Sequence, residues 1–241
     1  MVRDSIDQKP PVAYSPVDSL QQELRKITSD TSKAGIYTQI AAQYLNYDTI
    51  SNRKLKSNYQ NKALDYTMLA LHGYSKYNDT LGLRICFNNL AKVYRSQKRY
   101  SQAKWFILQS NTISRSINDV PNIISSLTEL AGIKMEIKDY TLAKRDLNEA
   151  LKLSAVNRYP RSESVVQQSY ALLYSHLKNY TMEAAAMKRH NFIEDSLRKG
   201  EEAQLIAKLN TQEVAQRKKK FSTISYKKVY KTNSSKRTAS I

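Results

Sequence analysis

The chain of 241 residues is poor in the residues that interrupt helices. It contains only five glycines and five prolines, and three of the prolines precede residue 17. The remainder therefore offers few places where a helix must end. Its single cysteine, Cys86, excludes an intrachain disulfide framework. These absences favour an all-α fold over architectures that depend on tight turns or covalent crosslinks.

Long apolar runs are also absent. No stretch approaches the roughly 18 consecutive apolar residues that a transmembrane helix requires. The N-terminal residues, MVRDSIDQKPPVAYSP, lack the apolar centre of a signal peptide. We therefore expect a cytoplasmic protein, or a periplasmic one if an export signal is missing from this sequence.

Residues that support catalysis are few and scattered. His72, His176 and His190 lie far apart in the sequence, and the nearest approach to a metal site is Glu194, one helical turn after His190. A lone His–Glu pair is more typical of two solvated neighbours than of a metal ligand set. The glycines occur singly, so no glycine-rich phosphate loop exists. The sequence predicts no enzyme, no metal and no cofactor.

The sequence does contain an internal repeat with an offset of 40 residues. Small residues and aromatics recur at this offset as Ala91, Ala131 and Ala171, and as Tyr100, Tyr140 and Tyr180. A second alanine follows the first by twelve residues in two copies, at Ala103 and Ala143. Two antiparallel helices can approach closely only where their side chains are small. Such a period predicts a solenoid of helix pairs.

This pattern resembles the tetratricopeptide repeat. The residues that carry the resemblance are Leu90, Ala91, Tyr94, Tyr100, Ala103, Ile107 and Ser110. The departures are the missing tryptophan near the start of each unit and Lys134 at an aromatic position. The extra residues beyond the family's 34 fall between the second helix of one unit and the first of the next. The resemblance implies an all-α, right-handed superhelical solenoid of antiparallel helix pairs.

Four units of about 40 residues follow from this spacing. We predict a flexible lead-in (residues 1–16), a repeat domain (17–197), an extended helix (198–216) and a basic, disordered tail (217–241). Within the repeat domain, Asp18 and Ser19 are candidate N-caps of a lone first helix, and residues 48–58 form an insertion in the first unit. The pairs Asn118-Asp119, Asn157-Arg158 and Lys178-Asn179 mark turns.

The C-terminal part carries a second, narrower resemblance. Repeats followed by Asp195-Ser196-Leu197 and a polar helix are similar to the sensor region of Bacteroidetes-type membrane-anchored regulators. That resemblance implies ligand sensing coupled to a histidine kinase or DNA-binding output. The residues after Lys220 are too polar for a span and too few for an output domain. The resemblance therefore covers a sensing region without its output.

The extended helix has a loose apolar stripe, and the tail has a strong charge. The stripe consists of Phe192, Ile193, Leu197, Leu205, Ile206, Leu209 and Val214. It predicts either a cap over the open end of the stack or a homodimer through this helix. Residues 217–241 hold nine Lys or Arg and no acid, half of the net charge of +18. This charge suggests binding to nucleic acid or an anionic membrane surface, although it is also compatible with an inert tail.

The repeat family implies a concave groove lined by the first helix of each unit. Carried over to this chain, its groove positions are Thr38, Ala42 and Leu45, then Ile85, Asn88, Lys92 and Arg95, then Ser125, Thr128, Gly132 and Met135, and finally Val165, Gln168, Leu172 and Ser175. Our candidate partner-binding residues are Asn88, Lys92, Arg95, Thr128, Met135, Gln168 and Leu172. Asn88, Lys92 and Arg95 could hold a carboxylate, and the later positions suit an apolar segment. The same residues also fit an ordinary solvated helix face.

These observations favour a protein-protein interaction scaffold that binds a peptide or partner protein in the groove. The alternative is the ligand-sensing region of a bacterial signal-transduction regulator. A third hypothesis is association with nucleic acid through the basic tail.

Overall fold

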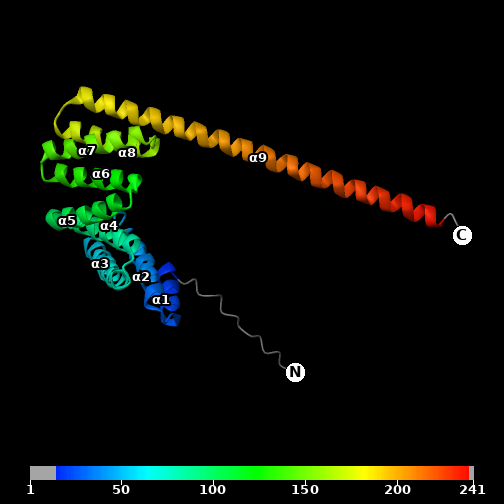
Figure 1. Cartoon of the computed structure of the whole chain (residues 1–241), viewed down its shortest axis with the longest axis horizontal. Helices are drawn as coiled ribbons and strands as arrows, with labels where there is room; N and C mark the ends of the chain where they lie inside the picture. Colours follow the sequence, from blue (N-terminus) through cyan, green and yellow to red (C-terminus); the bar gives the residue numbers. More distant parts are fainter. Residues whose placement is uncertain (1–14, 239–241) are drawn as a thin grey trace.

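A computed structural model describes residues 15–238 of the chain, and their side chains as far as residue 219. Within this range the backbone forms helices joined by short connections, without a β-strand (Figure 1). The helices are α1 (Pro16–Lys26), α2 (Asp30–Tyr44), α3 (Arg53–Lys76), α4 (Thr80–Ser96), α5 (Tyr100–Ser116), α6 (Val120–Glu136), α7 (Tyr140–Val156), α8 (Pro160–His176) and α9 (Tyr180–Thr238).

The helices pack in sequential pairs, α2 with α3, α4 with α5, α6 with α7 and α8 with α9. Each pair also contacts the next, so that the repeats form a continuous stack (Figure 1). The predicted all-α solenoid of four helix pairs is confirmed. Helix α1 adds a further element at the start, where Val17, Leu20 and Leu24 pack against the cluster around Ile40.

The six turns from the end of α3 to the start of α9 share one backbone conformation. A residue with a positive φ, between 54° and 65°, occurs every 20 residues at Asn78, Lys98, Asn118, Lys138, Arg158 and Lys178. After α4, the amide of Lys98 donates to the carbonyl of Arg95, and that of Arg99 donates to Tyr94. This pair of hydrogen bonds is the Schellman motif, which ends a helix and satisfies its last carbonyls. Its repetition fixes both the lengths of the helices and the turns that the sequence predicted.

The residue after each positive-φ position is the N-cap of the next helix. Asp79, Asp119, Asp139 and Asn179 each accept a hydrogen bond from a backbone amide in the first turn of the following helix. Such N-caps satisfy amides that would otherwise lack a partner. Arg99 and Tyr159 occupy the same position without a side-chain cap.

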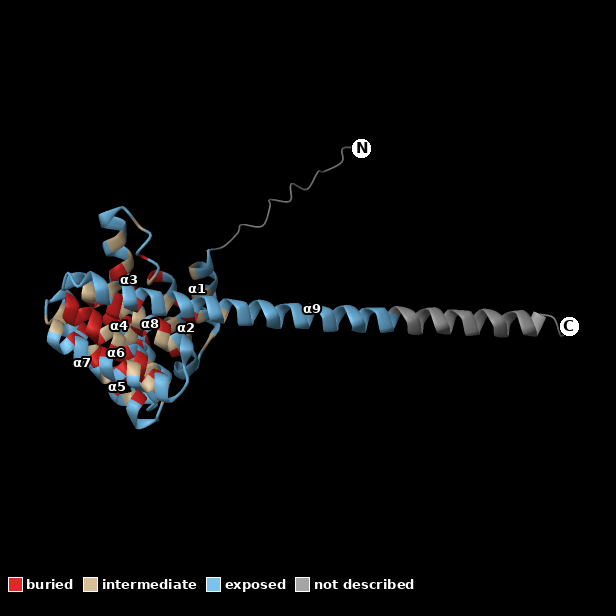
Figure 2. Ribbon diagram, turned by 90° about the horizontal axis from the view of Figure 1, so that it is seen from above, coloured by how far each residue is buried: buried red, intermediate tan, exposed pale blue. Residues whose placement is uncertain are grey.

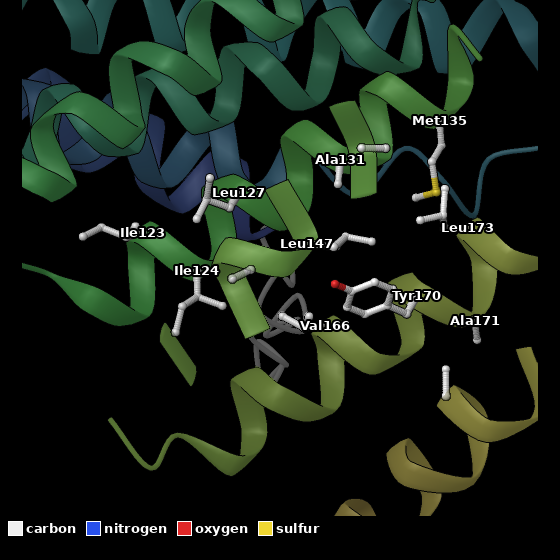
Figure 3. Packing of buried hydrophobic residues seen from close by; sticks show 13 residues of the cluster. Ile123, Ile124, Leu127, Ala131, Met135, Leu147, Val166, Tyr170, Ala171 and Leu173 are labelled. Carbon is white, nitrogen blue, oxygen red and sulfur yellow. The ribbon is translucent and has the colours of Figure 1, made fainter. Parts of the chain in front are cut away.

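The recurring alanines lie where the helices cross. Ala91, Ala131, Ala103 and Ala143 are almost completely buried, and the larger core residues surround them. Figure 3 shows this packing for α6, α7 and α8, where Leu147, Val166 and other apolar side chains point into the space between the helices. Small side chains allow close backbone approach, and the larger ones fill the remaining volume.

Several predicted boundaries need correction. Ser15 is the N-cap of α1, and Asp18 completes its capping box three residues later, so Asp18 and Ser19 are not N-caps. The rest of the predicted lead-in, residues 1–14, lies outside the described residues. Helix α3 begins at Arg53, so the predicted insertion divides between a connection and the first turns of α3. Helices α4 to α8 have 17 residues each, and connections of three residues join them. In these units the extra residues of the repeat therefore lengthen the helices instead of the loop.

Helix α9 differs most from expectation. Its first part packs on α8, but the side chains of residues 201–219 are exposed, and the helix projects away from the stack (Figure 2). The extension therefore does not cap the repeats. The helix continues to Thr238, which differs from the predicted disorder of residues 217–241. Gly200 is the last glycine or proline in the chain, and no later residue type forces the helix to end.

Candidate binding groove

Two adjoining hollows lie across the first helices of the repeats. The larger, with a volume of about 740 Å³, lies between α2, the connection after it, α4 and the end of α6. Its charged lining residues are Asp48, Lys92, Arg95, Lys98, Glu129 and Glu136. This first hollow therefore has charged groups of both signs at its rim.

The second hollow is smaller and less charged. Its volume is about 290 Å³, and it lies between α4, α6 and α8. Its apolar wall consists of Pro121, Ile124, Met135, Val165 and Leu172. The hydroxyls of Thr128 and Ser169 also line it, and each donates to a carbonyl of its own helix. The second hollow is therefore suited to an apolar side chain.

Arg95 separates the two hollows and is already paired within the protein. Its Nη1 donates to Glu129 over 3.0 Å, and its Nε donates to Glu136 over 2.7 Å. Both carboxylates are on α6, so the contacts join adjacent repeats. A Cβ at Gly132 would lie only 2.8 Å from Arg95 Nη2. The absence of a side chain at residue 132 thus allows the guanidinium to lie against α6.

Asn89 is the unusual polar residue of the first hollow. Only 9% of its surface is exposed, and it lines the hollow beside Lys92. Among the described residues, its side-chain amide has no hydrogen-bond partner. An amide both donates and accepts hydrogen bonds, and the polar atoms of Asn89 are not among the fully buried unpaired atoms of the described residues, so they are open to the hollow. Asn89 therefore has unused capacity to bind a polar ligand.

Some of the residues predicted for the groove line the first hollow, and others line the second. Lys92 lines the first hollow, Arg95 lines both, and Thr128, Met135 and Leu172 line the second. Met135 is also a buried core residue, so it forms a floor instead of an exposed contact.

Two predicted residues, Asn88 and Gln168, line neither hollow. The sequence argument missed Asn89, which lies one position after the expected asparagine. It also missed Glu129 and Glu136, which neutralise the cation expected to hold a carboxylate. Their separations from Arg95, 34 and 41 residues, are close to the repeat period and were the available signal.

A second polar cluster joins α8 to α9. Ser164 Oγ lies 2.8 Å from His190 Nδ1 and also donates to Glu194. The serine hydroxyl thus lies between the histidine and the glutamate. Ser164 is completely buried, which keeps its hydroxyl from a substrate. The cluster therefore serves as a polar contact between the last two helices.

Two kinds of site are absent from the described residues. No group of three or more His, Cys, Asp or Glu side chains could hold a metal ion in this part of the chain. None of the described helices is sufficiently long and apolar to cross a membrane.

The helix pairs, their stacking and the turns define a solenoid of the tetratricopeptide-repeat-like class. No family model matches the chain, and no curated protein matches it. A solved structure, described as the crystal structure of the apo form of RapI, has a TM-score of 0.62 to this chain at 17% sequence identity. The match covers 78% of this chain and 65% of RapI. At this identity the likeness establishes the fold alone.

Proposed function

We propose that this protein is an interaction scaffold that binds an extended segment of a partner polypeptide across α2, α4, α6 and α8. The observation that carries the proposal is the unpaired amide of Asn89 in the first hollow. A peptide bond of a partner offers the N–H and C=O groups that such an amide binds. Helical-repeat folds also commonly bind partners along extended surfaces of this kind.

The charges at the rim indicate the chemistry of the partner. Lys92 and Lys98 line the first hollow without an ion pair among the described residues. Arg95, in contrast, is already engaged by two carboxylates. The partner segment therefore carries an acidic side chain near the two lysines, and an apolar side chain that enters the second hollow beside Leu172.

The spacing within the partner follows from the spacing of helices. Neighbouring packed helices lie about 8–10 Å apart, and an extended chain advances about 3.3 Å per residue. Lys92 lies on α4 and Leu172 on α8, with α6 between them. The acidic and apolar side chains of a segment that passes from the first hollow to the second are therefore separated by two helix spacings, or about five to six residues along the segment. This spacing distinguishes the proposed ligand from peptides that are merely acidic.

The test is a display selection with the full chain as bait and random ten-residue peptides as probes. We expect selected peptides to combine an acidic and an apolar residue at the spacing above. Fluorescence anisotropy then measures the affinity of a selected peptide for Asn89→Ala and for the matched control Asn88→Ala. Loss of one net hydrogen bond predicts about a fivefold rise in Kd for Asn89→Ala and no change for the control. Equal effects of both substitutions would contradict the proposed groove.

The extension of α9 favours a second candidate function, the sensing region of a signalling regulator. Helix α9 is one continuous helix from the last repeat into solvent, and such a helix could transmit a shift of α8 to an output domain. Spin labels at Gln212 and Lys104 would report the distance between the extension and α5 with and without a selected peptide. An unchanged distance distribution would contradict the sensing function, and the scaffold function would then be the one that remains. Binding to nucleic acid remains a prediction from the sequence, since most side chains of the tail lie outside the described part.

A further inference from the structure

The side of α9 that faces away from α8 packs against no other helix in the described part of the chain. Ala186 and Ile193 bury the inner side against α8, which is the neighbour that α9 contacts within the described structure. On the outer side Tyr180 is 69% exposed and Met187 is 41% exposed. Solenoids normally end in a repeat with a polar outer face. The exposed apolar side chains at this end therefore indicate a face that something covers.

These residues belong to a longer row along α9. Tyr180, Ala184, Met187, Asn191, Glu194, Arg198, Leu205 and Leu209 are all exposed and succeed one another at helical intervals of three, four or seven. Residues at such intervals share one face of a helix. Arg198 lies about 140° around the helix from Ile193, at roughly 100° per residue. Apart from Glu194, which accepts a hydrogen bond from Ser164 on α8, the row is therefore directed away from α8.

The order of residues in the row is self-complementary. Its apolar members lie towards the two ends, at Tyr180 to Met187 and at Leu205 to Leu209, while Glu194 and Arg198 lie at its centre. When a second copy of the helix runs antiparallel, with Met187 opposite Leu205, Glu194 of each copy lies opposite Arg198 of the other. A parallel arrangement in register would instead place Glu194 opposite Glu194.

We propose that this row binds the same row of a second copy of the chain, so that two solenoids join end to end through antiparallel α9 helices. Such an interface is isologous, and each contact occurs twice around a twofold axis. The pairing covers residues 180–212, about 50 Å of helix at a rise of 1.5 Å per residue. It also explains why α9 continues beyond α8, because Leu205 and Leu209 would cover Met187 and Ala184 of the partner.

The charged centre of the row is available for this exchange. Arg198 donates to Asp195 over 2.7 Å within the same helix, and Glu194 accepts from Ser164. Both charged side chains remain exposed. A carboxylate has two oxygens and a guanidinium has five N–H groups, so each group can form the contact between copies in addition to its present one.

Disulfide trapping tests the arrangement directly. The native Cys86 is fully buried, so cysteines introduced at Met187 and Leu205 are the accessible thiols. We expect the double variant Met187→Cys/Leu205→Cys to form covalent dimers under mild oxidation. Each single variant should remain uncrosslinked, because equivalent residues of the two copies lie about 27 Å apart along the helix in this register. Crosslinking of the single variants would show parallel pairing and overturn the proposal.

Charge reversal provides the second readout. Sedimentation velocity would give the dimer Kd of the natural chain, of Glu194→Arg, of Arg198→Glu and of the two substitutions together. Each single reversal converts two attractive pairs into repulsive ones and should raise the Kd about tenfold. The double reversal should restore it, since the pairs become complementary again. A chain that stays monomeric at 100 µM, or a double variant as weak as the singles, would refute antiparallel pairing.

Discussion

Lys134 occupies a position where the repeat pattern calls for an aromatic, and the structure explains this departure. The side chain is buried and pairs with Asp146 on α7. The ion pair replaces the apolar contact that an aromatic would make between the two helices of the unit. A buried pair of this kind is strongly destabilising when one partner is lost, because the other charge stays buried and unpaired.

We therefore expect Asp146→Ala to lower the free energy of unfolding by about 3–5 kcal/mol. The double variant Lys134→Met/Asp146→Leu removes both charges and should recover most of the natural stability. Urea unfolding followed by circular dichroism measures both values. A double variant no more stable than Asp146→Ala would show that packing, and not the unpaired lysine, causes the loss.

The buried thiol of Cys86 makes the free energy of unfolding depend on pH. Burial raises the pKa of its thiol to about 12, whereas an exposed cysteine has a pKa of about 8.5. As the pH rises, the unfolded chain loses this proton first. The thiol therefore contributes stability that is fully present below the pKa of the unfolded chain and is lost as the pH rises towards 12.

Between pH 9.5 and 11 the natural chain should lose about 1.4 kcal/mol more per pH unit than Cys86→Ala. The comparison requires urea unfolding of both proteins at several pH values, and the variant controls for the titration of tyrosines and lysines. Parallel pH profiles of the two proteins would show that the thiol is not protected.

The helices of this fold end because of the backbone conformation of the turns that follow them. Residue types that disfavour helix contribute less. Lys98, Lys138, Arg158 and Lys178 have positive φ, a conformation that costs a non-glycine residue about 1–2 kcal/mol. The chain tolerates it because the Schellman hydrogen bonds and the following helix hold each turn in place. Asn78 and Asn118 occupy the equivalent turns, and asparagine adopts this conformation more readily.

Lys98→Gly should accordingly increase the free energy of unfolding by about 1 kcal/mol. Asn118→Gly is the matched substitution in the turn one repeat helix later, and it should have little effect. Thermal unfolding monitored by calorimetry distinguishes the two cases. A destabilised Lys98→Gly would indicate that the lysine side chain makes a contact in the turn that outweighs the strain.

At the scale of the whole molecule, the stack and the extension of α9 are energetically separate. Side chains from Glu201 to Lys219 are exposed, so this segment adds no buried core. Arg161 and Glu201 form an exposed ion pair between α8 and the start of the extension, and such pairs contribute about 0–1 kcal/mol. The repeats should therefore contribute nearly all of the free energy of unfolding.

A chain that ends at Glu202 should unfold at the same temperature as the full chain, within about 2 °C at micromolar concentration. Calorimetry at increasing protein concentration gives the control, because only the full chain should show a rise in its melting temperature. A large loss of stability in the shortened chain at low concentration would show that the extension folds back on the stack.

The sequence by itself determined the repeat, the all-α class, the helix pairs and the positions of the turns. These features depend on local preferences and on a spacing that recurs along the chain, such as the alanines from Ala91 to Ala171. The tertiary structure decided which side chains meet across different helices. It placed Asn89 instead of Asn88 in the first hollow and neutralised Arg95 with two glutamates of the next repeat. It also directed α9 into solvent, because the apolar residues beyond Leu197 find no neighbouring helix in the described stack. Contacts of this kind depend on rotation and distance between helices, which a spacing in one dimension does not specify.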